Sequence, residues 1–353
     1  MSKSDNKVTI NDVARVAGVS KGTVDRVLHN RGEVSPKSRE KVLKVIEELG
    51  YKPNVYASLL ASQKRRVLCC LVPEYGAGDF WSLTAKGLAE SEDAAARYGV
   101  TINTVTYDQY EIESFRSACR TVLEMAPSGV IIAPMFKDET LVFTAELTER
   151  DIPYVYIDTR IEDDQNYFAY FGMPMFQSGY LCADILMNDT PVDRVYVVRV
   201  ERDKTKQSDP TAARRSGFMK YMEEYYPQTE VVNVFINPQN RDQRFAKLDE
   251  AFAGDSGRKH IVMFNSRIHL VADYVRERAI SGNRIVGFDC IEKNLAALRD
   301  GTVQVLITQH SDRHASSAVN ALVDKSILGK DMPRRNNYSQ MDILNRYNCE
   351  FYM

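Results

Sequence analysis

Polar and aromatic side chains follow the ends of several apolar runs between residue 67 and the end of this 353-residue chain. Carboxylates and amides can pair with neighbouring hydroxyl groups, an arginine can make a fork-shaped contact, and an aromatic ring can stack on a pyranose face. Open parallel sheets bind ligands just outside the carboxyl ends of their strands. These residue types therefore indicate a sugar-type ligand site, for which the candidates are Phe80, Trp81, Asp158, Arg214, Asn265, Asp289 and Gln309.

Each candidate also has an ordinary structural explanation. A carboxylate or amide at a strand end, such as Asp158 or Asn265, often forms a turn or caps a helix. Trp81 is the only tryptophan and stands near a predicted helix start, where a lone aromatic ring often belongs to the core. A ligand site and these structural roles are both compatible with the sequence.

Parallel strands joined by crossover helices must position these side chains, because short apolar runs alternate with longer helical patterns. Ten strands exceed one comfortable sheet, so we expect two doubly wound α/β lobes. The predicted strands are Val67–Pro73, Thr101–Thr106, Val130–Pro134, Tyr154–Asp158, Tyr167–Gly172, Val195–Val200, Val231–Ile236, Ile261–Phe264, Arg284–Asp289 and Val303–Thr308. The predicted helices include Phe80–Tyr98, Phe176–Met187, Thr211–Tyr226, Arg241–Ala253, Ile268–Arg278 and Ser311–Leu328.

A second chemical possibility lies near the N terminus, where residues 9–28 predict two short helices joined at Gly18. Thr9 can cap the first helix with Asp12 in a capping-box arrangement, and glycine can take the positive φ that the turn needs. A third helix is predicted to start at Ser35-Pro36. This small all-α unit is a helix-turn-helix, which indicates DNA binding, although many helical hairpins never touch DNA.

The charge distribution favours DNA binding. Residues 1–66 hold 14 lysines and arginines against 7 acidic residues, whereas the rest of the chain holds 32 against 41. The formal net charge of −2 therefore combines a basic head with an acidic body.

The segment after the third helix predicts a conditional helix. The Tyr51-Lys52-Pro53-Asn54 run ends the preceding helix, and residues 55–62 offer one more short helix. Eight residues cannot hold a helix alone in water, so we expect this helix to form only against a partner. Ala57 and Ala61 lie one turn apart and would permit a close approach.

Val8–Ser62 resembles the DNA-binding headpiece and hinge of the LacI family of bacterial transcription regulators. The matching motifs are Thr-Ile-Asn-Asp-Val-Ala, Ala-Gly-Val-Ser, Thr-Val-Asp-Arg-Val-Leu and Gly-Tyr-Lys-Pro-Asn, in the family's order. The resemblance implies that Leu60 wedges into the minor groove and that the recognition helix meets base edges. The implied DNA-binding residues are Thr9, Ser20, Lys21, Gly22, Thr23, Asp25, Arg26, Asn54, Ala57 and Leu60.

Two residues depart from the family pattern in the recognition helix. Gly22 has no side chain to reach a base, and Asp25 replaces the usual serine. We expect Asp25 either to accept a hydrogen bond from a cytosine amino group or to pair with Lys21 or Arg26.

The order of elements after Val67 is similar to the type I periplasmic-binding-protein fold of the same family, whose effector contacts match the seven candidates above. The implied domains are 1–52, the headpiece; 53–65, the hinge helix and linker; and 66–353, the ligand-binding and dimerisation domain. Lobe 1 is expected at about 66–160 and 292–310, and lobe 2 at about 161–290 and 311–353. The chain is expected to cross between the lobes near 159–165, 290–293 and 309–312. Met175, Phe176 and Gln177 stand where the family is usually more polar.

These features predict a cytoplasmic, homodimeric repressor-type regulator that binds a near-palindromic operator in double-stranded DNA and responds allosterically to a carbohydrate. We expect no catalytic site, cofactor, metal or membrane segment, and His310 and His314 are interpreted as a helix start at the pocket rim. The alternatives are a regulator that responds to a protein partner or a phosphorylated metabolite, and a binding module or enzyme on the same two-lobed fold.

Overall fold

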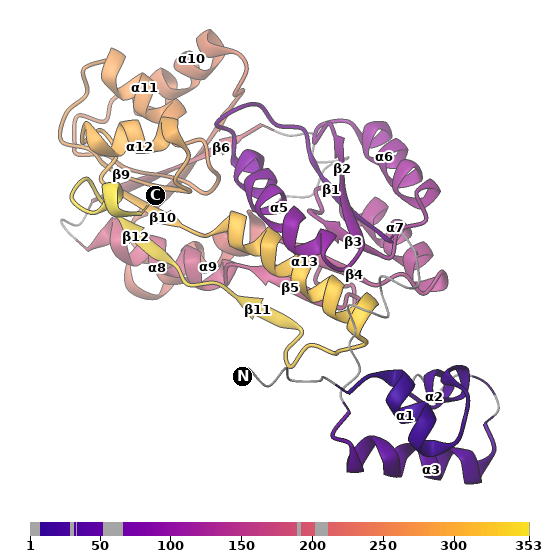
Figure 1. Ribbon diagram of the computed structural model, residues 1–353. Helices are drawn as coiled ribbons and strands as arrows, with labels where there is room; N and C mark the ends of the chain where they lie inside the picture. The colour runs from indigo at the N-terminus through magenta and orange to yellow at the C-terminus, as the bar shows by residue number, and fades with distance from the viewer. Residues whose placement is uncertain are drawn as a thin grey trace. The chain divides into compact units, whose positions relative to one another are not determined.

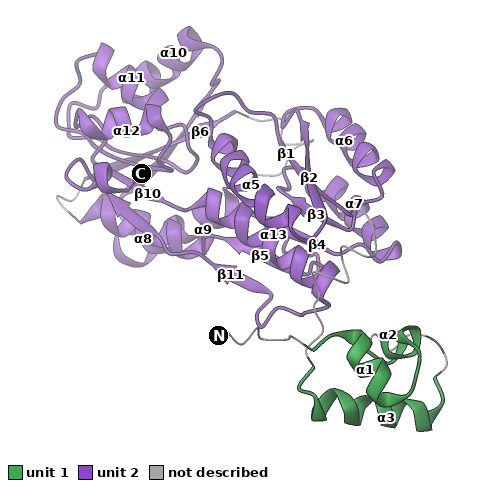
Figure 2. Cartoon of the chain, in the orientation of Figure 1, with its two compact units in different colours: residues 1–64 green, residues 65–353 purple. Residues whose placement is uncertain are grey.

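The computed structural model describes residues 8–28, 32, 34–51, 66–188, 192–201 and 211–352. The chain divides into two compact units, residues 1–64 and residues 65–353 (Figure 2). The predicted DNA contacts at Asn54, Ala57 and Leu60, and the predicted hinge helix, lie outside the described residues.

Within its described residues, the first unit is a bundle of three helices, α1 (Ile10–Ala17), α2 (Lys21–Leu28) and α3 (Pro36–Glu48). The predicted capping box is confirmed, because the Asp12 amide donates to Thr9 Oγ1 and the Thr9 amide donates to Asp12 Oδ2. Gly18 has a φ of 66°, the left-handed conformation predicted for the turn. The core of the bundle consists of Val13, Ala14, Ala17, Val24, Val27, Val42 and Val45.

The second unit contains two six-stranded sheets, which define lobe 1 and lobe 2. All strands of the lobe 1 sheet run parallel, in the order β11-β5-β4-β3-β1-β2. Its strands are β1 (Arg66–Pro73), β2 (Val100–Tyr107), β3 (Gly129–Ile132), β4 (Tyr154–Ile157), β5 (Ala169–Gly172) and β11 (Asn336–Tyr338). Two helices pack together on one face and two lie on the other (Figure 1): α5 (Phe80–Ala96) with α13 (Ser311–Leu328), and α6 (Ile112–Glu124) with α7 (Lys137–Glu149).

The lobe 2 sheet has the order β12-β10-β9-β8-β6-β7 and is parallel except for β12. Its strands are β6 (Arg194–Val200), β7 (Glu230–Ile236), β8 (His260–Met263), β9 (Arg284–Phe288), β10 (Val305–Thr308) and β12 (Asp342–Leu344). One face is covered by α8 (Met175–Met187) and α9 (Ala212–Tyr225). The opposite face is covered by α10 (Arg241–Phe252), α11 (His269–Glu277) and α12 (Glu292–Arg299), as Figure 1 shows. A short 3₁₀ helix, Cys349–Phe351, ends the described chain.

The predicted two-lobed α/β architecture is confirmed, and each predicted strand overlaps a strand of the structure. The predicted lobe membership is wrong in three places. Residues 161–172 belong to lobe 1, because β5 pairs with β4, and residues 292–310 belong to lobe 2, because β10 pairs with β9. Residues 311–338 belong to lobe 1, because α13 packs on α5 and on the lobe 1 strands and because β11 pairs with β5.

The predicted crossings near 159–165 and 290–293 are therefore wrong, and the one near 309–312 is correct. The first crossing is at residues 173–174, because the chain after β4 returns beside it through an irregular loop with no helix. The third lies between β11 and β12, at residues 339–341. Both strands have only three residues, too few for an apolar pattern to reveal them.

Among the residues that the structure describes, no helix has the length and apolar character needed to cross a lipid bilayer.

Candidate functional site

A cavity of about 350 Å³ lies between the two lobes and takes its walls from both. All seven side chains predicted for the ligand site line this cavity. Lobe 1 supplies them from the start of α5 and the end of β4, and lobe 2 supplies them from α9 and the ends of β8, β9 and β10. The carboxyl ends of strands in two different sheets thus converge on one space.

Two buried carboxylates face this cavity, each directly after a strand. Asp158 follows β4 with a φ of 60°, and Asp289 follows β9 with a φ of 67°. A left-handed backbone is uncommon for residues other than glycine and is concentrated at functional sites. The turn at each strand end therefore aims a carboxylate into the cavity at a cost in backbone strain.

Asp158 is held by two side chains from the first turn of α13. Its Oδ1 atom accepts a hydrogen bond from Ser311 Oγ at 3.0 Å and lies 2.8 Å from His314 Nδ1. Its Oδ2 atom is buried and has no hydrogen-bond partner within the described part of the chain. That oxygen can accept a hydrogen bond from a ligand hydroxyl, since a buried acceptor without a partner is unfavourable.

Asp289 has an unusual electrostatic environment. Burial raises the pKa of Asp289 to about 6, and the positive charge of Arg214 opposes that rise. Gln309 Nε2 donates to Asp289 Oδ1 at 3.3 Å, whereas Gln309 Oε1 is buried and lacks a partner among the described residues. A ligand with hydroxyl donors would satisfy Gln309 Oε1 together with the open oxygen of Asp158.

Arg214 is fixed in place by the protein. Its Nε donates to Ser178 Oγ at 3.1 Å, another guanidinium nitrogen bonds to the Phe264 carbonyl, and the group lies 3.9 Å from the centre of the Phe288 ring. Burial lowers the pKa of Arg214. Part of the hydrogen-bonding capacity of the Arg214 guanidinium is therefore used within the protein. Arg214 offers the cavity a positive charge in a fixed position.

Trp81 and Asn265 each have a structural role in the fold and also line the cavity. Trp81 is only 9% exposed and belongs to the lobe 1 core, but it also lines the cavity, edge to face with Phe80 at 4.9 Å. Asn265 Oδ1 accepts a hydrogen bond from the Arg267 amide at 3.0 Å, which makes the turn predicted as its alternative role. Both side chains reach the cavity from positions that the fold also requires.

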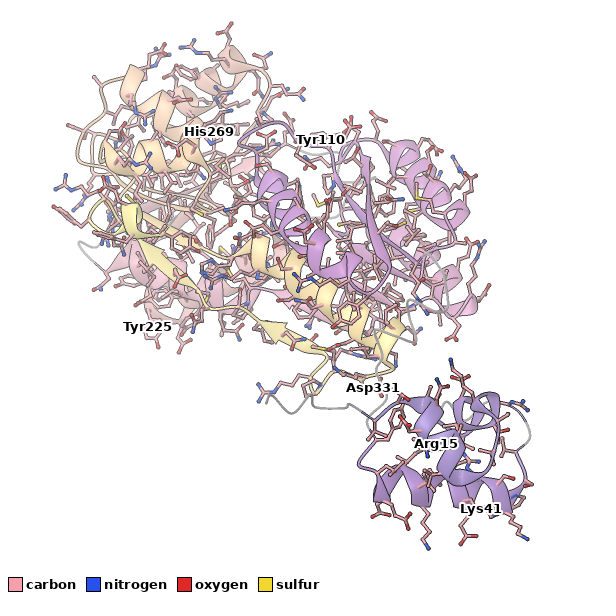
Figure 3. The ribbon with its side chains drawn as sticks, in the orientation of Figure 1. Arg15, Lys41, Tyr110, Tyr225, His269 and Asp331 are labelled. Carbon is pink, nitrogen blue, oxygen red and sulfur yellow. The ribbon has the colours of Figure 1, made fainter. Side chains whose placement is uncertain are left out.

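Several further residues line the cavity that the sequence reasoning did not single out, among them Glu74, Arg267, His269 and Lys293. Arg267 and His269 come shortly after β8, so the strand-end rule applied a few residues further along would have found them. Arg267 also donates to Tyr110 Oη at 2.9 Å, a hydrogen bond from lobe 2 to lobe 1. Figure 3 places Tyr110 on lobe 1 and His269 on lobe 2.

Of the three residues Met175, Phe176 and Gln177 at the start of α8, only the first lines the inter-lobe cavity. Met175 lines the cavity, and its sulfur lies 3.3 Å from a guanidinium nitrogen of Arg214. Phe176 and Gln177 are exposed and line two other surface pockets, one on lobe 2 and one lined by residues of both lobes.

The helix α2 presents the residues predicted to meet DNA. Lys21, Gly22 and Arg26 are exposed, and Arg26 Nε donates to the Gly22 carbonyl at 3.2 Å. Ser20 Oγ accepts from the Thr23 amide at 3.1 Å and so caps the helix. Other predicted residues include Thr9, which is exposed, and Asp25, which is half-buried; burial and the charge of Asp25 raise the pKa of Tyr51.

The histidines at the start of α13 have separate partners. His314 faces Asp158, whereas His310 Nε2 lies 2.8 Å from Asp342 and its ring stacks on Tyr352. Within the described ranges, no group of three metal-ligating side chains comes together.

Comparisons with known proteins agree with this arrangement. A family model described as a periplasmic binding protein domain matches residues 69–331, and one described as bacterial regulatory proteins, lacI family, matches residues 9–54. A crystal structure of a Bacteroides fragilis protein assigned to the LacI transcriptional regulators superposes with a TM-score of 0.78 and 30% identity. It covers 82% of this chain and 100% of that protein's chain.

Two curated relatives are named as regulators. The HTH-type transcriptional regulator RegA of Clostridium saccharobutylicum is 35% identical over 156 residues, a match that spans 44% of this chain and 45% of RegA, less than half of each. The ribose operon repressor of Lactococcus lactis is 25% identical over 302 residues, 80% of this chain and 81% of that protein.

The fold and the matched models define a two-lobed periplasmic-binding-protein body preceded by a helix-turn-helix headpiece. The chain belongs to the LacI family of bacterial regulatory proteins.

Proposed function

We propose that the protein is a transcription regulator whose headpiece binds a specific sequence in double-stranded DNA and whose affinity for that sequence is set by a small molecule in the inter-lobe cavity. The convergence of seven predicted side chains on one cavity carries the proposal. A ligand that binds one lobe arrangement better than another shifts the population toward it, and linkage makes the effect on DNA affinity reciprocal.

A neutral, hydroxyl-rich ligand of the sugar class fits the cavity best. The described lining includes four carboxylates and three permanent cations, namely Glu74, Asp79, Asp158, Asp289, Arg214, Arg267 and Lys293. Burial lowers the pKa of His269, which keeps that ring neutral. This balance disfavours a phosphorylated metabolite, and the open oxygens of Asp158 and Gln309 require hydroxyl donors. One relative is named as a ribose operon repressor, and a sugar in that name supports the proposal.

We assign the site a binding role without catalysis. Ser311, His314 and Asp158 have the residue types of a hydrolytic triad, but Ser311 Oγ donates to Asp158 and not to His314. The serine hydroxyl therefore has no base to activate it in this arrangement. A chromosomal regulator of this kind acts in the cytoplasm, and a homodimer would suit a near-palindromic operator.

The DNA function is tested by selecting sequences from random duplexes with the full chain and measuring affinity for the selected site. Lys21→Ala and Arg26→Ala should each weaken binding to that site by roughly tenfold, since a good base contact contributes about 1–3 kcal/mol. Lys41→Ala, an exposed change on α3, is the control. Affinity should fall steeply as salt rises. Equal affinity for random and selected DNA would contradict the proposal.

The ligand function is tested by a thermal-shift screen of neutral sugars and their phosphorylated forms. A neutral sugar should raise the melting temperature in proportion to the logarithm of its concentration. Asp289→Asn, which keeps a residue that tolerates the left-handed backbone, should abolish that shift and leave DNA affinity unchanged. Stabilisation by phosphorylated sugars alone would favour the metabolite alternative.

A further inference from the structure

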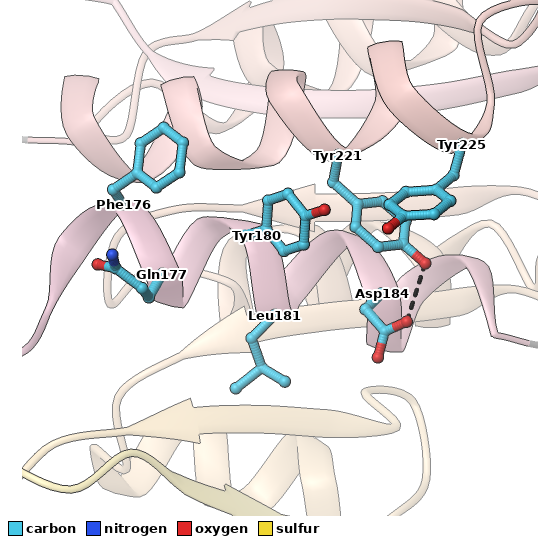
Figure 4. A pocket seen from close by; sticks show the side chains of 7 residues that line it. All are labelled: Phe176, Gln177, Tyr180, Leu181, Asp184, Tyr221 and Tyr225. Atoms are coloured by element: carbon cyan, nitrogen blue, oxygen red, sulfur yellow. Dashed lines mark hydrogen bonds between the residues drawn. The ribbon is translucent and has the colours of Figure 1, made fainter.

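A second cavity, of about 640 Å³, lies on the outer face of lobe 2 and has no residue in common with the inter-lobe cavity. It is lined by α8 and α9, the helices that cover one face of the lobe 2 sheet. Figure 4 shows its lining from close by, and Figure 3 places Tyr225 on this face. The pocket is widely open to solvent.

Aromatic rings form its walls. Phe176 and Tyr180 lie one turn apart on α8, and Tyr221 and Tyr225 lie one turn apart on α9 (Figure 4). The three tyrosine rings contact one another, with centroids 5.0 Å apart for Tyr180 and Tyr221 and 4.7 Å apart for Tyr221 and Tyr225. Phe176 is 41% exposed and Tyr225 is 56% exposed, so two of these rings face solvent.

Two carboxylates give this aromatic surface a negative charge. Asp184 accepts a hydrogen bond from Tyr221 Oη at 2.8 Å, and Glu224 accepts one from Tyr180 Oη at 3.1 Å. Neither carboxylate forms an ion pair within the described residues. Burial and the bond to Asp184 raise the pKa of Tyr221, and bonds to Tyr225 and Glu224 raise that of Tyr180, so both phenols stay neutral.

We propose that this α8–α9 cavity binds a small organic cation with an alkylated ammonium group. Aromatic faces attract such cations through the ring quadrupole, and alkyl groups on the nitrogen reduce the cost of leaving water. Asp184 and Glu224 add the complementary charge, and both already accept a hydrogen bond from a tyrosine of the pocket. A free inorganic cation would keep its hydration shell and gain little from the rings.

Choline and its neutral isostere, 3,3-dimethylbutan-1-ol, are the probes, because they share a shape and differ in charge. Calorimetric titration of the full chain should show choline binding roughly tenfold more tightly than the alcohol, a ratio equivalent to about 1.4 kcal/mol. Tyr225→Ala should weaken choline binding by a similar factor, while Tyr225→Phe retains it. Asp184→Asn should weaken the binding of choline but not of the alcohol, because it removes the charge while the amide oxygen can still accept the hydrogen bond from Tyr221.

Tyr347→Ala is the matched control, since Tyr347 is 74% exposed and does not line the cavity. Equal affinity for choline and the alcohol would overturn the proposal, as would choline binding that survives Tyr225→Ala. Absence of choline binding at tens of millimolar would also overturn it. If Tyr225→Ala instead changes the oligomeric mass in solution, the face is a contact between copies of the chain and the proposal fails.

Discussion

At the scale of single residues, the site contains two aspartates whose backbone is strained and whose carboxyl groups are buried. Asp158 and Asp289 both adopt a left-handed backbone and both are buried, with 3% and 4% of their surface exposed. These costs are local to the cavity, where a bound ligand can compensate for them. The empty protein should therefore be less stable than its fold would allow.

Asp289→Asn should stabilise the ligand-free protein in a pH-dependent way. Because the folded state raises the pKa of Asp289 from 3.8 to about 6, the native carboxyl holds its proton more tightly than the unfolded one. Its contribution to stability is lost as the pH rises from about 4 to about 6. The variant should exceed the wild type by up to about 3 kcal/mol at pH 7.5 and match it at pH 3.5.

Urea unfolding at several pH values measures this difference. Asp151→Asn is the control, because Asp151 also has a left-handed backbone, with a φ of 55°, but is exposed. It should change stability by no more than about 0.5 kcal/mol at either pH. A stability gain for Asp289→Asn that is the same at every pH would point to relief of strain and not to the carboxyl charge.

At the scale of elements, both lobes rely on helix pairs that approach through glycine. A β-carbon on Gly87 of α5 would lie 2.0 Å from the Asp312 carbonyl oxygen, at the start of α13. In lobe 2, a β-carbon on Gly217 of α9 would lie 1.9 Å from the Phe176 carbonyl oxygen of α8. Since α9 also carries Arg214 and α8 carries Met175, this contact fixes one wall of the inter-lobe cavity.

Gly217→Ala should therefore destabilise lobe 2 by about 3 kcal/mol or more, because backbone atoms cannot yield as a side chain can. Calorimetric melting measures the loss. Ser216→Ala, its exposed neighbour in the same helix, should leave the melting temperature nearly unchanged. Similar behaviour of the two variants would mean that α8 and α9 can separate without consequence for the lobe.

The sequence predicted the elements well and their partners less well. Local patterns suffice for a capping box at Thr9 or a strand before Asp289, and the strand-end rule gathered seven cavity residues from distant segments. The lobe that an element joins depends on contacts between residues far apart in the chain. For this reason the prediction placed α13 in the wrong lobe. The tyrosines of the α8–α9 cavity carried no signal, because aromatic residues at helical spacing are usually core.

At the scale of the molecule, a hydrogen bond from a residue of the cavity lining joins the two lobes. Arg267 of lobe 2 donates to Tyr110 of lobe 1 at 2.9 Å, and both lie on loops that follow strands. A bond at this position favours the arrangement in which the lobes are close. Its contribution, about 1.5–3 kcal/mol for a charged donor, is enough to change a population by roughly tenfold or more.

Tyr110→Phe should shift the ligand-free protein toward larger separations between the lobes. Spin labels at the exposed residues Glu149 and Ser281, one on each lobe, would report the distance distribution by electron resonance. Tyr347→Phe, a change at an exposed tyrosine outside the cavity, is the control. An unchanged distribution in Tyr110→Phe would show that other contacts set the closed arrangement.

The return of the chain to lobe 1 has a consequence for synthesis on the ribosome. The strand β5 ends at Gly172, but α13, which covers one face of the same sheet, begins only at Ser311. At a synthesis rate of ~5–20 residues per second, that apolar face stays exposed for roughly 10–30 s before α13 has been made. A nascent chain of this length is therefore a natural client for chaperones, and premature termination anywhere within lobe 2 would release an aggregation-prone fragment instead of a working half-protein.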